Sequence, residues 1–113
     1  MNLIEMETAI IGFRPEHFLP RDIYTIAARL IPFQFCLTRI EYLGADRLLY
    51  GLLKTSFATD HKVIANLPAT VTMTLHPGAC YQFAVPEPDL KFFDRTTGLR
   101  IPPSVDSIVQ LER

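Results

Sequence analysis

The sequence contains no tryptophan, only two cysteines and three histidines, and no excess of basic residues. Eleven Lys and Arg residues face twelve Asp and Glu residues, so the net charge is -1 and electrostatic binding to nucleic acid is disfavoured. Apolar runs such as Leu48–Leu53 are far shorter than the ~20 residues that a membrane-spanning helix needs. The first seven residues include two acids and no Lys or Arg, unlike a signal peptide. We therefore expect a cytoplasmic domain.

The residue patterns of common catalytic sites are also missing. The phosphate-binding loop of ATPases (Walker A) needs a glycine-rich turn followed by Lys and Ser or Thr, and none of the five glycines precedes a lysine. No serine lies in a Gly-x-Ser-x-Gly elbow, and the histidines lack the spacing of a zinc site. The sequence predicts a chain that is not an enzyme and that binds no cofactor or metal.

The two cysteines, Cys36 and Cys80, lie within strand-like patterns. They form neither a Cys-x-x-Cys metal motif nor the cysteine-rich pattern of a disulfide scaffold. A cysteine nucleophile would need a nearby base and a positively charged setting, which the sequence does not indicate. We interpret both residues as reduced members of the core.

The chain of 113 residues is 49% hydrophobic, enough for one core and not for two domains. Nine prolines and five glycines divide it into short segments with alternating apolar residues, which is typical of all-β proteins. The clearest alternation lies in Thr70–Leu75, where threonines alternate with apolar residues. Helical spacing follows a possible cap at Asp22 and continues to Leu30. The pattern predicts six or seven short strands in a small barrel, with at most one short helix.

A change of phase within one segment predicts a β-bulge. Phe33, Phe35 and Leu37 are apolar at odd positions, whereas the apolar positions that follow, Ile40 and Tyr42, are even. A bulge inserts one residue and so produces this shift.

Two further features depend on how the strands pack. A glycine inside the next strand, Gly51, marks a bend or a close approach of backbones. Aromatic residues recur along the strand-like segments, and without interleaved Lys or Arg they indicate a core more than a surface for stacking bases; they are Phe33, Phe35, Tyr42, Tyr81 and Phe83.

Three local clusters combine turn residues with charged groups: Gly12–His17, Leu43–Asp46 and Phe92–Ile101. Their structural interpretation is that Arg14 and Glu16 anchor a loop, while the last cluster forms a turn with an aspartate bonded to its amides and a glycine at positive φ. The alternative is contact with a ligand or a partner. The candidate contact residues are Arg14, Glu16, His17, Asp46, Arg47, Asp94, Thr97 and Gly98.

Taken in order, Gly12–His17, Glu41–Asp46, Pro77-Gly78 and Leu90–Ile101 resemble motifs in the C-terminal domain of ATP-binding-cassette (ABC) subunits of bacterial sugar and glycerol-3-phosphate importers. The resemblance implies a transport-associated OB-like (TOBE) barrel, related to molybdate-binding (MOP-like) barrels. It places this domain at residues 10–103, after an N-terminal segment with the start of the first strand (1–9) and before a C-terminal tail (104–113).

The resemblance also implies a function without catalysis. The expected role is regulation and dimerisation of an importer for carbohydrate or glycerol-3-phosphate. The implied partners are the nucleotide-binding domain and membrane subunits at the inner membrane face, and a second copy in a homodimer. The family's nucleotide-binding domain is missing from these 113 residues, which leaves a fragment and a freestanding domain both open.

The alternative function is a freestanding module that binds a small oxyanion or a sugar phosphate. The donors expected for such a ligand are Arg14, Arg47 or the amides of the turn Asp94–Gly98. Neither function involves nucleic acid.

Overall fold

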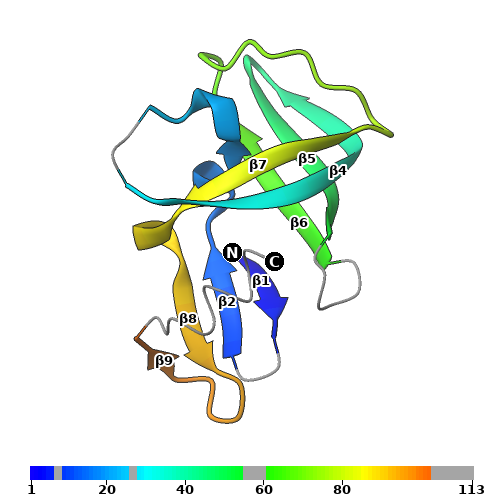
Figure 1. Cartoon of the computed structure of the whole chain (residues 1–113). Helices are drawn as coiled ribbons and strands as arrows, with labels where there is room; N and C mark the ends of the chain where they lie inside the picture. The colour runs from blue at the N-terminus through cyan, green and yellow to red at the C-terminus, as the bar shows by residue number, and fades with distance from the viewer. Residues whose placement is uncertain (7–8, 26–27, 55–60, 103–113) are drawn as a thin grey trace.

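The computed structural model describes residues 1–6, 9–25, 28–54 and 61–102, and these fold into β-strands and short 3-10 turns (Figure 1). No α-helix occurs among these residues. Their short 3-10 turns are not long and apolar enough to cross a bilayer. The strands are β1 Asn2–Glu5, β2 Ala9–Phe13, β3 Leu19–Pro20, β4 Leu30–Leu43, β5 Asp46–Lys54, β6 His61–Leu67, β7 Cys80–Pro86, β8 Lys91–Asp94 and β9 Arg100–Ile101. The all-β prediction is confirmed.

Three 3-10 turns connect these strands: η1 (Pro15–His17), η2 (Arg21–Ile23) and η3 (Glu87–Asp89). β2 cannot continue through Pro15, because proline has no amide hydrogen for the ladder. The fixed φ of this proline suits the first position of η1. The expected helix after Asp22 is limited to η2 in the described chain, and its positions 26–27 lie outside the described residues.

The strands form two antiparallel sheets (Figure 1). The first has the order β1-β2-β8-β9, and the second has the order β3-β7-β4-β5-β6. No ladder between the described strands closes either sheet on itself, so the expected barrel takes the form of two open sheets. The domain boundaries expected from the resemblance stay a prediction, and the tail 104–113 lies outside the described residues.

An aromatic cluster joins the two sheets. Its centre is Phe18, in the connection between β2 and β3, whose ring centroid lies 5.2 Å from that of Phe13 and 5.2 Å from that of Phe35. Phe83 of β7 completes the contact at 5.0 Å from Phe18, and all four rings are buried. Because Phe13 belongs to the first sheet and Phe35 and Phe83 to the second, one continuous core holds both sheets together.

A buried asparagine links the edge strands of the two sheets. The side-chain amide of Asn2 on β1 donates to the carbonyl oxygen of Ile64 on β6 at 2.8 Å, and the amide of Ile64 donates to Asn2 Oδ1 at 2.9 Å. These two bonds replace the hydrogen bonds that a neighbouring strand would make with the backbone of Ile64. Asn2 therefore satisfies part of the exposed β6 edge and fixes the position of one sheet against the other.

The predicted bulge is confirmed in β4. Leu37 pairs with Gly51 on β5, whereas Arg39 pairs with the adjacent Tyr50, so Thr38 is the extra residue. Its hydroxyl donates to the carbonyl oxygen of Tyr50 at 2.9 Å. The inserted residue explains why the apolar positions change phase along this strand.

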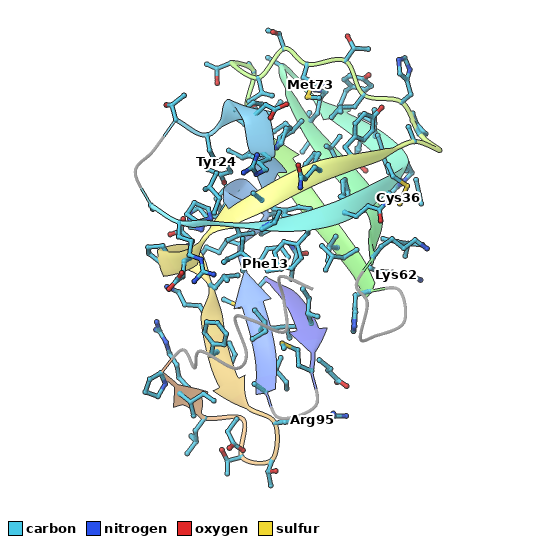
Figure 2. The ribbon with its side chains drawn as sticks, in the orientation of Figure 1. Phe13, Tyr24, Cys36, Lys62, Met73 and Arg95 are labelled. Carbon is cyan, nitrogen blue, oxygen red and sulfur yellow. A yellow bond between two sulfur atoms is a disulfide. The ribbon has the colours of Figure 1, made fainter. Side chains whose placement is uncertain are left out.

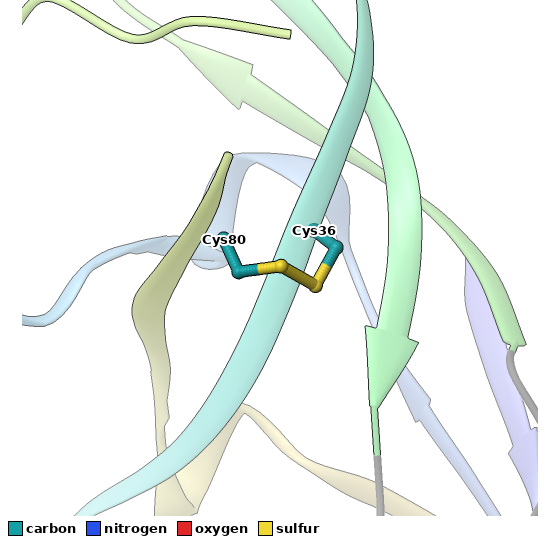
Figure 3. The surroundings of a disulfide bond; sticks show 2 residues. All are labelled: Cys36 and Cys80. Atoms are coloured by element: carbon teal, nitrogen blue, oxygen red, sulfur yellow. A yellow bond between two sulfur atoms is a disulfide. The ribbon is translucent and has the colours of Figure 1, made fainter. Parts of the chain in front are cut away.

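The interpretation of the two cysteines as reduced core residues is wrong. Cys36 on β4 and Cys80 on β7 are paired in register and joined by a disulfide with an S–S distance of 2.02 Å (Figure 3). Both lie on the sheet face opposite the buried Phe35 and Leu37, with Cys36 half-buried and Cys80 exposed. Their separation of 44 residues hides the pairing from any local pattern in the sequence.

The alternation in Thr70–Leu75 does not correspond to a strand of either sheet. Its apolar positions still behave as predicted in part, because Val71 and Leu75 are buried while Met73 is exposed. The segment lacks a backbone ladder, and side chains from β5 hold it in place instead.

Candidate functional site

The eight candidate residues lie at three separate places: on and before η1, at the turn between β4 and β5, and at the turn after β8. Figure 2 shows Met73, whose carbonyl oxygen binds Arg47 beside the β4–β5 turn, and Arg95 of the turn after β8 at opposite ends of the molecule. The structure thus does not bring the candidates together into one site. Contact with a ligand or partner stays a prediction for each of them.

At the β4–β5 turn, two candidate side chains bind the backbone of the segment 68–76. The guanidinium of Arg47 donates to the carbonyl oxygen of Met73 at 2.9 Å and to that of Val71 at 2.8 Å. The amide of Ala69 donates to Asp46 Oδ1 at 3.0 Å. Arg47 thus supplies two of the bonds that a neighbouring strand would have made.

Replacement of Arg47 by glutamine is expected to lower the free energy of unfolding by about 1–2 kcal/mol, because two charge-assisted bonds to carbonyls are lost. Hydrogen exchange should also accelerate at the amides of Val71 and Ala79, which bond within and beside the segment. Urea unfolding and NMR-detected exchange measure both effects. Arg21→Gln, at an exposed arginine of η2, is the control, and equal effects of the two substitutions would contradict the role of Arg47.

Three large apolar side chains are exposed at this end of the molecule: Tyr42 and Leu43, which point to opposite faces of β4, and Met73 in the segment that Arg47 binds. They are here called the tip patch. Their exposed fractions are 70%, 50% and 39%. The core prediction is therefore wrong for Tyr42, although it is confirmed for Phe33, Phe35 and Phe83, while Tyr81 packs against the core partly buried.

Neighbouring charges on the hairpin pair with one another below the tip. Arg39 Nη1 lies 3.8 Å from Glu41 Oε2, and the Arg39 guanidinium carbon lies 4.1 Å from the centroid of the Tyr50 ring. These contacts support the hairpin stem below the tip.

The turn after β8 has the geometry expected from its structural interpretation. Asp94 Oδ1 accepts hydrogen bonds from the amides of Thr96 and Thr97, both at 2.8 Å. The amide of Gly98 donates to the Asp94 carbonyl oxygen at 2.8 Å, and Gly98 has a φ of 74°. Three of the amides proposed as oxyanion donors are thus bonded within the turn, so an external anion would have to open it.

These amide bonds lower the pKa of the Asp94 carboxyl group, with the Thr97 amide as the largest cause and the Thr96 amide next. A carboxyl group with a depressed folded-state pKa stabilises the fold above its ordinary pKa, and this contribution is lost as the pH falls through the folded-state pKa.

We expect an NMR titration of the Asp94 carboxyl carbon to give a midpoint below the ordinary value of about 3.9. Asp94→Ala should flatten the acid limb of the unfolding free energy below about pH 4, where the wild-type chain loses this contribution. A midpoint at or above the ordinary value would show that the carboxylate does not cap the turn.

The candidates around η1 are held by backbone and tyrosine contacts. The amide of His17 donates to the carbonyl oxygen of Arg14 at 3.0 Å, and the hydroxyl of Tyr24 donates to the carbonyl oxygen of His17. His17 Nδ1 lies 4.0 Å from Asp89 Oδ1. Burial, and secondly the charge of Asp89, raise the pKa of Tyr24 to about 12, so its hydroxyl remains a donor. Glu16 and Arg14 are exposed.

Arg95 is an anchoring residue that the sequence does not indicate. Its Nη1 donates to the carbonyl oxygen of Met6 at 3.0 Å, and its Nη2 lies 3.6 Å from Glu5 Oε2. The turn after β8 is thereby tied to the end of β1, 89 residues away in sequence. In the described residues, no group of three or more His, Cys, Asp or Glu side chains could hold a metal ion.

Comparison with known proteins adds one relationship. The chain is 32% identical over 94 residues to the sn-glycerol-3-phosphate import ATP-binding protein UgpC of Ruegeria pomeroyi. It is distantly similar to part of an importer's ATP-binding protein. The match covers 83% of this chain and 23% of UgpC, so the chain spans about a quarter of the length of the curated relative it matches. No protein-family model matches the chain.

Proposed function

We propose that the chain is a non-catalytic TOBE domain, equivalent to the C-terminal part of an ABC importer's ATP-binding subunit. The observation that carries this proposal is the similarity to UgpC, which covers most of this chain and a minor part of that protein. The order of the four motifs supports it independently. The all-β architecture with exposed turn motifs agrees with an accessory domain.

The proposed role is to hold ATP-binding subunits together and to receive regulatory signals on the cytoplasmic side. A ligand or protein that binds one arrangement of the domain better than another shifts the ATPase between states by that difference in affinity. The proposed partners are the nucleotide-binding domain, the membrane subunits and a second copy of the chain, in uptake of carbohydrate or glycerol-3-phosphate.

We assign the contact with a second copy to the tip patch. Tyr42 and Leu43 are exposed apolar groups at the tip of the hairpin, and Met73 is exposed on the segment that Arg47 and Asp46 fix against that hairpin. A rigid apolar surface loses little conformational freedom on association, which favours binding.

Sedimentation velocity over a concentration range from about 10 µM to about 1 mM tests self-association. We expect the wild-type chain to sediment faster as its concentration rises, and the double substitution Tyr42→Ser with Leu43→Ser to remove the effect. Arg21→Gln should behave as wild type. A monomer at every concentration would remove dimerisation from the proposed function.

The alternative, a freestanding oxyanion binder, is less well supported by the geometry. Of its expected donors, Arg47 and three turn amides already donate within the chain.

A further inference from the structure

A pocket of about 670 Å³ opens where the ends of the two sheets meet. Its walls come from β8 and β9 of the first sheet, and from η3 and the residues just before β4 of the second. None of the candidate residues predicted from the sequence lines it. Its volume falls within the range of small-molecule sites in proteins.

The floor of the pocket is apolar and firmly held. Leu90 and Phe92 are buried members of the core, and Ile101 packs against that core while pairing with Phe92 across β8 and β9. The amide of Leu90 donates to the carbonyl oxygen of Glu87 at 3.1 Å. The floor is therefore built by the fold itself, which spares a ligand the cost of ordering it.

The rim carries two arginines and one glutamate. Arg29 Nη1 lies 3.6 Å from Glu87 Oε2, and the amide of Glu87 donates to the carbonyl oxygen of Arg29 at 2.8 Å. The glutamate charge is thus already compensated. The side chain of Arg100, in contrast, is exposed and makes no hydrogen bond or ion pair within the described residues.

We propose that this pocket binds a small organic carboxylate. The planar guanidinium of Arg100 can pair with both oxygens of a carboxylate, and the apolar body of the ligand would lie against the partly exposed Ile101, above the buried Leu90 and Phe92. An inorganic anion is a poorer fit because the apolar floor offers no donors to its remaining oxygens. The site is built within this chain, so it does not depend on the proposed role in a transporter.

Benzoate is a suitable probe because it joins a carboxylate to a flat apolar ring. In ¹H–¹⁵N NMR titrations we expect it to shift the amide signals of Leu90, Phe92 and Arg100 in a saturable way at millimolar concentration. Benzamide, with the same ring and no charge, and acetate, with the charge and no ring, should each bind roughly tenfold more weakly.

Substitutions at the rim test the assignment of the charge. Arg100→Gln should weaken benzoate binding roughly tenfold, Arg100→Lys should weaken it less, and Arg21→Gln should leave it unchanged. Arg100 is exposed on a two-residue edge strand, so the variants should fold, and their spectra without ligand verify this.

Three results would overturn the proposal. Absence of saturable shifts with benzoate would exclude the site, and equal binding of benzoate and benzamide, or of wild type and Arg100→Gln, would exclude carboxylate recognition. None of these results bears on self-association through the tip patch, which sedimentation measures separately.

Discussion

Gly51→Ala is expected to lower the free energy of unfolding by about 3 kcal/mol or more, or to prevent folding. A Cβ atom at this position would lie 2.4 Å from the carbonyl oxygen of Cys36 and 2.7 Å from Cε1 of Phe35. Neither neighbour can move easily, since Cys36 belongs to the central strand β4 and the Phe35 ring is buried against Phe18 and Phe83. Urea unfolding followed by circular dichroism measures the change.

Gly44→Ala is the matched control for this substitution. Gly44 has a φ of 63°, and a Cβ atom added there would meet no atom within 4 Å, so only backbone strain of about 1 kcal/mol is expected. If Gly51→Ala cost no more than Gly44→Ala, the close approach of β4 and β5 at the bulge would be wrong.

The second large effect concerns the disulfide between Cys36 and Cys80. Removing it by the double substitution of both cysteines with alanine is expected to lower the free energy of unfolding by about 3 kcal/mol. The bond joins residues 44 positions apart, so it restricts a long loop in the unfolded chain. Unfolding in urea, with and without dithiothreitol, measures this contribution.

The double variant also provides the control for the reductant. Dithiothreitol should lower the stability of the wild-type chain to about that of the variant, and it should leave the variant unchanged. Mass spectrometry after alkylation without reductant should find no labelled cysteine in the wild-type chain. Labelling of both cysteines under oxidising conditions would contradict the disulfide.

Features that depend on a few adjacent residues could be predicted from the sequence. The bulge at Thr38 shifts the apolar pattern by one position, and such a shift is visible without knowing any partner strand. The turn after β8 was predictable for the same reason, because Asp94 bonds amides only two and three residues ahead. Local chemistry fixes these structures, so a local pattern reports them.

Features that depend on contacts between distant segments could not be predicted. The Cys36–Cys80 bond requires the register of β4 against β7, which the alternation in either strand leaves undetermined. Thr70–Leu75 has the alternation of a strand, yet Arg47 supplies its hydrogen bonds in place of a ladder. The alternation was a better guide to which side chains are buried than to which groups form hydrogen bonds with the backbone of this segment.

The candidate site was predictable only in part, for a related reason. The sequence motifs mark the turns correctly, but charged residues in a turn can bond inward or face a partner. Arg47 and Asp94 bond inward in the structure. The pocket beside Arg100 is assembled from η3, β8, β9 and the residues before β4, and no single segment carries a pattern for it.

Binding to an ATP-binding subunit tests the central proposal most directly. The measurement is the affinity of the chain for UgpC of Ruegeria pomeroyi from which the segment similar to this chain has been removed, by isothermal titration calorimetry at up to about 100 µM. An accessory domain should bind in a saturable way and change the rate of ATP hydrolysis by that protein. No binding, together with an unchanged hydrolysis rate, would contradict the proposed function.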